Sequence, residues 1–460
     1  MLFLVYFAYL VLIVGFIAFM RRLMRERIMA IPILALLLME LITIWPATIV
    51  SYGSGISHDA YLLALVLGTN LALFAGYLLG APLFRIRPGL AYAFHARPVE
   101  PPPPGALTAI WVVSFALSFA AALYTANGIP PLWSSLLGGP TEILADMVRE
   151  QRLESTKTHY FGGEYRGQGV IKTLMMVVPV FMVAAAAVGH AVRPSRGRLF
   201  FLLGTIGLAL LLAMSIGSRG PMVNVLLATV AMGAFLWRLR ASQIIGALAV
   251  FVAAVLFVSI SMPRYHASFA ESGLGFLPDG IVSIVERVSL VNTSNTVLAV
   301  EAGRMGMVER DFAEEHVDKI VRLLPNAAGE LPLSSELTAL RRGNVRTTAF
   351  ATPTWLASTF LDFGFIGSMV CYLLLGLLVA FGESWIFTWR KTVVGVAVAS
   401  VLTLVVAMAI VSSPLTLIPF GVILAGYAVV CHMIVNVFRA NAPVPPPGFS
   451  RPPRPLRQTP

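Results

Sequence analysis

The chain alternates between long apolar stretches and shorter polar connections. Eleven stretches are close to the roughly 20 residues that cross the hydrocarbon core of a bilayer as a helix. This pattern predicts an all-α polytopic membrane protein with about 11 transmembrane helices. Because no basic residue precedes the first stretch and no small-residue cleavage site follows it, we expect a retained helix rather than a signal peptide. The stretches are 2–20, 28–50, 58–80, 105–126, 170–191, 199–216, 220–237, 243–261, 354–381, 392–411 and 414–437.

The composition excludes several classes of protein. Hydrophobic residues make up 58% of the chain and charged residues 12%, where soluble domains have about 45–50% and about 25%. An ordinary soluble enzyme, a disordered chain and a fibrous repeat are therefore excluded. The two cysteines, Cys371 and Cys431, lie within apolar stretches, and the sequence has no CxxC or Cys/His cluster. We accordingly expect no structural metal and no cofactor.

The positions of the basic residues predict the orientation of the chain. Arginine or lysine follows every odd-numbered stretch, whereas the short connections near Gly53 and Ser413 contain neither. By the positive-inside rule, the N-terminus is outside and the C-terminus is in the cytoplasm. The net charge of +11 then reflects contact with membrane lipids, and no nucleic-acid partner is expected. The clusters include Arg21, Arg22, Arg85, Arg87, Arg97, Arg193, Arg196, Arg198, Arg238, Arg240, Arg390, Lys391 and Arg439.

Residues 1–441 form the expected membrane domain, which includes two long outer loops. The loop 127–169 has a turn-rich start followed by a short predicted helix. The loop 262–354 is much longer than most connections and has helical periodicity over 281–302, so it predicts a small helical subdomain. The segment 442–460 is rich in proline and arginine and is predicted to be a disordered cytoplasmic tail.

The string Gly217-Ser218-Arg219-Gly220-Pro221 joins two apolar stretches at the expected outer face. Ser218 can cap the following helix, and Pro221 suits its first turn. Arg219 and free backbone N–H groups would then form a site for phosphate or pyrophosphate. A tight hairpin whose arginine reaches the lipid headgroups is the alternative. Further outer arginines could converge on the same anion: Arg149, Arg152, Arg264, Arg341, Arg342 and Arg346.

Four further side chains are functional candidates. His159 and His266 lie in the outer loops and could act as general bases near neutral pH. Asp362 lies early in the ninth apolar stretch and Glu40 in the second, where a carboxyl group is costly and therefore a functional candidate. The alternatives are ordinary loop histidines and an interfacial acid. The chain has no nucleotide-binding loop, so an ATP-driven pump is not indicated.

The chain resembles the bacterial oligosaccharide repeat-unit polymerases, the O-antigen polymerases of the Wzy type. Three features carry the resemblance: the string 217–221, the large outer loop in the last third, and the sequence Thr359-Phe360-Leu361-Asp362-Phe363-Gly364-Phe365-Ile366-Gly367 leading into Leu374-Leu375-Gly376. The resemblance implies a GT-C-like fold. It also implies inverting, metal-independent glycosyl transfer that polymerises undecaprenyl-pyrophosphate-linked oligosaccharide repeat units into a surface polysaccharide. The reaction would take place at the periplasmic face of the bacterial inner membrane, with a chain-length regulator as a possible partner.

The implied mechanism gives roles to the candidate residues. Arg219, with Ser218 and Gly220 beside it, would hold the pyrophosphate, aided by Arg264 and an arginine of the first loop. His159, His266, Glu271 or Asp362 would take part in the chemistry, one of them accepting the proton of the acceptor hydroxyl. Three other functions stay open, of which the simplest is a scaffold for chain assembly without catalytic activity. The second is an O-antigen ligase that uses the same donor. The third is a lipid-linked sugar flippase or secondary transporter, although the charges are concentrated in the outer loops and we find no internal repeat.

Overall fold

The computed structural model describes residues 32–43, 60–86, 90–126, 168–215, 219–237, 292–308, 354–411 and 414–441, with short pieces between them that include 312–314 and 316–317. Within these residues the regular structure is entirely helical, and no strand occurs. The expectation of an all-α protein is confirmed for this part of the chain.

Six helices are long and apolar enough to cross a membrane: α4 (Ala60–Leu83), α6 (Ala106–Thr125), α9 (Gln168–Val192), α10 (Arg196–Met214), α18 (Trp355–Thr388) and α20 (Ile418–Ala440). The shorter helices are α2 (Pro32–Thr43), α5 (Leu90–Ala96), α11 (Arg219–Leu236), α15 (Asn292–Arg304), α19 (Val393–Met408) and the 3-10 turn η3 (Pro414–Leu417). Each long helix coincides with a predicted stretch. The stretches 2–20 and 243–261 lie almost entirely outside the described residues, so the count of 11 spans and the GT-C fold stay predictions.

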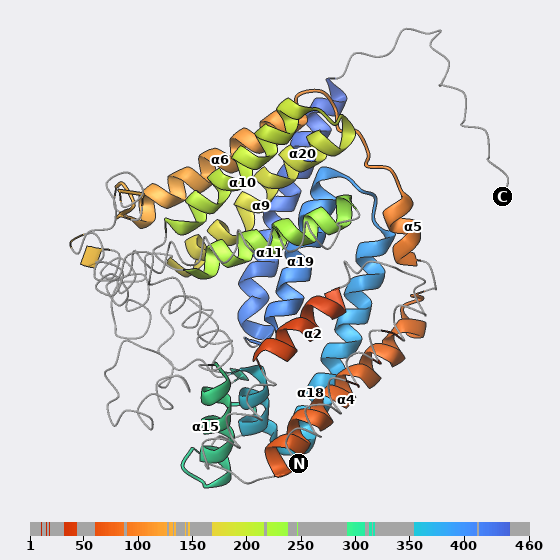
Figure 1. Ribbon diagram of the computed structural model, residues 1–460, viewed down its shortest axis with the longest axis vertical. Coiled ribbons are helices and arrows are strands. Elements are labelled where there is room, and N and C mark those ends of the chain that lie inside the picture. Colours follow the sequence, from red (N-terminus) through yellow and green to blue (C-terminus); the bar gives the residue numbers. More distant parts are fainter. Residues whose placement is uncertain are drawn as a thin grey trace, which may run out of the picture.

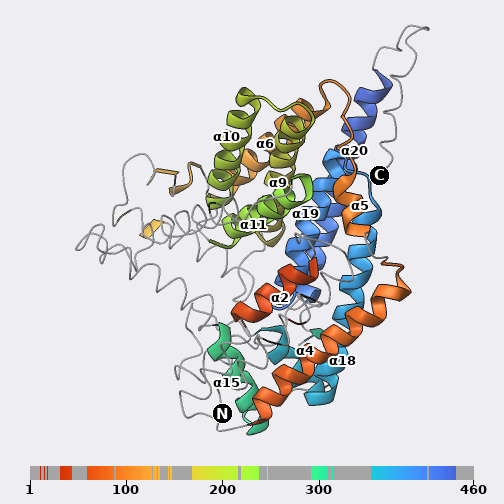
Figure 2. The same cartoon turned by 45° about the vertical axis from the view of Figure 1, so that its right-hand side comes forward.

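The buried apolar residues form two cores, each built by its own group of helices. In the first, α9 lies among α6, α10, α11, α19 and α20, and most of its residues from Met175 to Val188 are buried. In the second, α4 and α18 run side by side against α2 and α15 (Figures 1 and 2). Helices α11 and α19 contribute side chains to both cores and so connect the two groups.

Helices α4 and α18 approach each other until their backbones touch. A Cβ atom added to Gly76 would lie 2.0 Å from the carbonyl oxygen of Leu373, and one added to Gly376 would lie 2.2 Å from that of Leu73. Small residues recur at every fourth position of α4, at 68, 72, 76 and 80. Such spacing is typical of membrane helices that pack at short distance. The contacting positions rise together along both helices, so the pair is parallel.

Basic residues meet at one end of the bundle, here named the Arg97 end after its central contact. The Arg97 guanidinium donates hydrogen bonds to the carbonyls of Thr388 and Trp389, at 3.3 and 3.2 Å, and thereby caps the end of α18. The backbone N–H of Glu100 donates to the carbonyl of Lys391, and the Glu100 carboxylate lies 3.6 Å from Arg439. Three clusters predicted on the same side of the membrane therefore lie together.

The opposite end, named the Asp362 end, is where α18 begins. The ring of Phe94 contacts both Phe235, near the end of α11, and Phe387, near the end of α18. From this contact α11 runs across the direction of α18 (Figures 1 and 2), and Trp355 begins α18 at the Asp362 end. There the backbone N–H of Trp355 donates to the carbonyl of Ile410, just beyond α19.

A buried carboxylate joins three helices. Glu383 of α18 has no exposed surface and accepts hydrogen bonds from the hydroxyl of Tyr77 in α4 and, at 2.8 Å, from the backbone N–H of Ile33. Ile33 is the second residue of α2, where backbone N–H groups have no partner within the helix. Glu383 thus satisfies the first turn of α2 while holding this helix against the α4/α18 pair.

The substitution Gly76→Ala tests the close approach of α4 and α18. Since the new methyl group would overlap a backbone carbonyl, we expect a loss of about 1–3 kcal/mol in unfolding free energy and a lower midpoint of thermal unfolding in detergent. Gly204→Ala in α10 is the matched control, because a Cβ there meets no atom within 4 Å. Equal midpoints for the two variants would contradict the close packing.

The substitution Glu383→Leu tests the tie between the three helices. It would leave the Ile33 N–H and the Tyr77 hydroxyl buried without their acceptor, at a cost of about 1–3 kcal/mol for each. Glu383→Gln keeps an acceptor oxygen and should destabilise the protein less. Thermal unfolding of both variants measures the difference. If the leucine variant were as stable as the glutamine variant, the carboxyl oxygens would not hold α2.

Candidate functional site

The site lies where α18 is interrupted. Gly364 has φ 68° and ψ −166°, inside a helix that is regular on both sides of it. This left-handed conformation favours glycine, because a side chain there would be strained. The hydroxyl of Ser368 donates a 2.8 Å hydrogen bond to the carbonyl of Gly364, the residue at which the helix is interrupted. A Cβ built on Gly364 meets no atom of the described residues within 4 Å, so they leave space beside the break.

Asp362 lies two residues before the break, and its side chain is fully buried. It accepts a 3.0 Å hydrogen bond from the backbone N–H of His316 and lies 2.5 Å from Nδ1 of the same residue. Two bonds from one residue orient the carboxylate and also fix the His316 segment against α18. Asp362 was predicted to be functional because burying a carboxyl group is costly. In the structure this carboxyl group is paired with a titratable side chain, that of His316.

The hydrogen bonds of His316 define its tautomer. Its Nε2 lies 3.3 Å from the indole nitrogen of Trp355. An indole N–H can only donate, so Nε2 accepts and carries the lone pair. The ring proton is then on Nδ1, from which it is donated to Asp362. A carboxylate that orients an imidazole through Nδ1 and leaves Nε2 as an acceptor is the arrangement that general-base catalysis uses.

The side chains of Asp362 and His316 differ in their exposure. The side chain of Asp362 has no exposed surface, whereas 13% of the His316 side chain is exposed. Of the two side chains, only the imidazole retains exposed surface. Phe363 lies 5.1 Å from the His316 ring, and Trp355 stacks on Tyr372 with ring centroids 5.0 Å apart. These aromatic contacts hold the imidazole and its indole partner in place.

Helix α15 brings a cation to the same end. A Cβ added to Gly303 would lie 2.5 Å from the side chain of Leu361, so α15 packs against the residue that precedes Asp362. Arg304 follows, with its guanidinium 3.5 Å from the Glu301 carboxylate and 4.8 Å above the ring of Tyr61. Tyr61 in turn contacts Phe360 and Phe365 on either side of the break in α18.

Two of the predicted anion-binding residues are at the start of a helix. Helix α11 begins at Arg219, and Gly220 in its first turn is exposed with open space around it. The side chain of Arg219 is not among those that the structure describes. The other predicted site residues also lie outside the described part: His159, His266, Glu271, Arg149, Arg152, Ser218, Arg264, Arg341, Arg342 and Arg346.

Neither His316 nor Arg304 is among the site residues predicted from the sequence. His316 lies in a charged segment of the second outer loop, and no local pattern distinguishes it from His159 or His266. Asp362 was the feature of the sequence that pointed to the site, because an acid at the border of an apolar stretch requires a partner. Only the folded chain identifies that partner, 46 residues away in sequence.

Glu40, the weaker intramembrane candidate, is also completely buried. One of its oxygens accepts a 3.0 Å hydrogen bond from the side-chain amide of Asn70 in α4. The other, Oε2, is buried and has no hydrogen-bond partner among the described residues. Among the described residues, no group of three or more His, Cys, Asp or Glu side chains could hold a metal ion.

Comparison with known proteins adds no assignment. No protein-family model, curated protein or solved structure matches the chain. The site must therefore be interpreted from its own residues and geometry.

Proposed function

We propose that the protein is a membrane glycosyltransferase that polymerises undecaprenyl-pyrophosphate-linked oligosaccharide repeat units into a surface polysaccharide. The observation that carries the proposal is the Asp362–His316 pair beside the break in α18. Asp362 and Gly364 both belong to the sequence 359–367, one of the three features in which the chain resembles repeat-unit polymerases. A partly exposed general base beside open space suits the activation of a sugar hydroxyl.

The proposed orientation follows from the charges. Short basic connections are retained in the cytoplasm, so the Arg97 end faces the cytoplasm and the Asp362 end faces the periplasm of the bacterial inner membrane. The N-terminus is then periplasmic and the C-terminus cytoplasmic. The site lies on the face where lipid-linked repeat units would be joined.

In the proposed reaction, the acceptor hydroxyl replaces the Trp355 indole as the donor to Nε2 of His316. As the proton moves to Nε2, the acceptor oxygen attacks the anomeric carbon of the donor repeat unit. The bond from that carbon to the pyrophosphate oxygen breaks, and undecaprenyl pyrophosphate leaves with the electron pair. Attack from the opposite face inverts the anomeric configuration. The buried Asp362 carboxylate stabilises the imidazolium that forms.

Cations stabilise the departing pyrophosphate in this proposal, without a metal ion. Arg219 at the start of α11 is the proposed clamp, because the N–H groups of a first helical turn and a guanidinium both favour an anion. Arg264 and an arginine of the first outer loop remain proposed partners. Arg304 is a further cation at the Asp362 end. Charge that develops as the sugar bond breaks is stabilised most by groups already fixed in place.

The substitution His316→Asn separates a catalytic imidazole from a structural one. An asparagine amide can take the position of Nδ1–H and still donate to Asp362, but it cannot accept a proton at the position of Nε2. We expect polymer synthesis to fall by about 10²-fold or more, with single repeat units accumulating on the lipid carrier. The measurement is gel and mass-spectrometric analysis of surface polysaccharide and lipid-linked intermediates, in a deletion strain that expresses each variant at equal abundance.

Trp355→Phe is the matched control, because it keeps an aromatic ring stacked on Tyr372 and removes only the N–H donor to His316. We expect this variant to retain most of the polymer, and Asp362→Asn to lose it as His316→Asn does. A long polysaccharide ladder from His316→Asn at wild-type amount would show that the histidine is a structural clamp. Lipid-linked polymer that accumulates without reaching its final acceptor would assign the protein as a ligase.

A transporter of lipid-linked sugars is the second candidate, and a specific observation favours it. Three carboxyl groups, Glu40, Asp362 and Glu383, are buried within helices of the bundle, and one of those helices is broken. Buried acids and discontinuous helices are common in secondary transporters. The two functions differ in what a loss of activity leaves behind. Without a polymerase, single repeat units still reach the cell surface, whereas without a flippase none do.

A further inference from the structure

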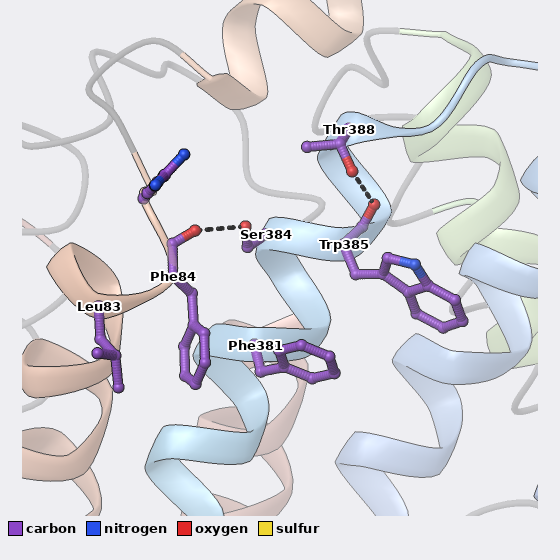
Figure 3. A pocket seen from close by; sticks show the side chains of 7 residues that line it. Leu83, Phe84, Phe381, Ser384, Trp385 and Thr388 are labelled. Carbon is purple, nitrogen blue, oxygen red and sulfur yellow. Dashed lines mark hydrogen bonds between the residues drawn. The ribbon is translucent and has the colours of Figure 1, made fainter.

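A groove opens at the Arg97 end, far along α18 from the proposed site. It encloses about 310 Å³ between the end of α4 and the last turns of α18. Its walls carry three aromatic rings, those of Phe84, Phe381 and Trp385 (Figure 3). The lining residues are Leu83, Phe84, Arg85, Phe381, Ser384, Trp385 and Thr388.

Internal hydrogen bonds fix the shape of the groove. The Ser384 hydroxyl donates to the carbonyl of Phe84 at 2.6 Å and thereby ties the end of α4 to α18 (Figure 3). The Thr388 hydroxyl donates to the carbonyl of Trp385 at 2.7 Å. The rings of Phe84 and Phe381 meet edge to face with centroids 5.2 Å apart. Both hydroxyl protons are used within the wall, so the donors left for a ligand come from other residues.

Arg85 supplies the positive charge of the groove. It is exposed and has φ 58°, the left-handed conformation that ends many helices. The backbone N–H of Ile86 donates to the carbonyl of Ala81, which closes the last turn of α4 around it. Glycine is the usual residue at such a position, since other side chains are strained there. Here an arginine occupies it and lines the groove. The half-exposed indole of Trp385 is a second donor.

An exposed apolar stripe leads into the groove along α18. Its members lie three or four residues apart, which places them on one face of the helix, and each is between 48% and 62% exposed. They are Val370, Leu374, Leu378, Phe381 and Trp385. Leu79 and Leu83 on the neighbouring α4 are exposed beside it. The combination is an apolar track that ends in a cavity with a guanidinium and an indole at the border of the membrane.

We propose that this groove binds a phospholipid with an anionic headgroup. The phosphate pairs with Arg85, and an acyl chain lies along the stripe 370–385. An anionic lipid is favoured over a neutral one by charge complementarity. The exposed side chains of Arg97, Arg390 and Arg439 add positive charge at the same end. The lipid would reinforce the contact between the end of α4 and the last turns of α18. This inference does not depend on the reaction at the Asp362 end.

Native mass spectrometry of the full-length protein in mild detergent tests the proposal. The protein is titrated with phosphatidylglycerol and, separately, with phosphatidylcholine of the same acyl chains. We expect the wild type to retain phosphatidylglycerol preferentially, and Arg85→Gln to weaken that binding about fivefold, the effect of one basic residue near an anionic surface. Phosphatidylcholine binding should not change between the two proteins.

Arg196→Gln is the matched control, because it removes the same charge from an exposed arginine at the start of α10, away from the groove. This variant should bind phosphatidylglycerol as the wild type does. Equal weakening in both variants, or equal binding of the two lipids by the wild type, would overturn the proposal. A protein dimer that Leu378→Ser dissociates would instead assign the groove to a second copy of the chain, and would overturn it as well.

Discussion

The direct backbone contact between α4 and α18 is the constraint on which the other features depend. Apolar surface gives little attraction between helices in lipid, so close packing and hydrogen bonds must hold them together. Gly76 and Gly376 allow an approach that any side chain would prevent. That approach sets the position of both buried acids of α18. Glu383 meets Tyr77 and the first turn of α2, and Asp362 lies where the segment containing His316 covers the opposite end.

Buried polar groups explain why segments distant in sequence come together. A carboxylate removed from water is stable only when donors surround it. Asp362 obtains two donors from His316, and Glu383 obtains one from each of two helices. Glu40 has the amide of Asn70 on only one of its oxygens. The three acids therefore differ in their surroundings. Of the three, only Asp362 is paired with a histidine, and that histidine is partly exposed.

The helical architecture could be predicted from the sequence because apolar length is a local property. The stretches at 58–80, 105–126 and 170–191 correspond to α4, α6 and α9 within a few residues. Charge also predicted which connections share an end, as the contacts of Arg97, Lys391 and Arg439 confirm. The break at Gly364 was not predicted. Glycine is common in membrane helices, and an apolar run gives no sign of where the chain leaves the helical conformation.

The site was predicted only in part, for a related reason. The cost of burying an acid identified Asp362 from sequence alone. Its partner could not be found in this way, since a hydrogen bond between residues 316 and 362 depends on how the second outer loop folds back onto α18. The groove near Arg85 could not be predicted from the sequence either. It forms from the ends of two helices that lie 300 residues apart in sequence, and only their parallel packing brings Phe84 to Ser384.

Reconstitution of the purified protein tests the central claim most directly. The protein in lipid nanodiscs would be supplied with undecaprenyl-pyrophosphate-linked repeat units and no other protein, and the products would be resolved by mass spectrometry. The account predicts a series of products that differ by one repeat unit, with one undecaprenyl pyrophosphate released for each bond formed. Recovery of unchanged single repeat units from folded protein would contradict it.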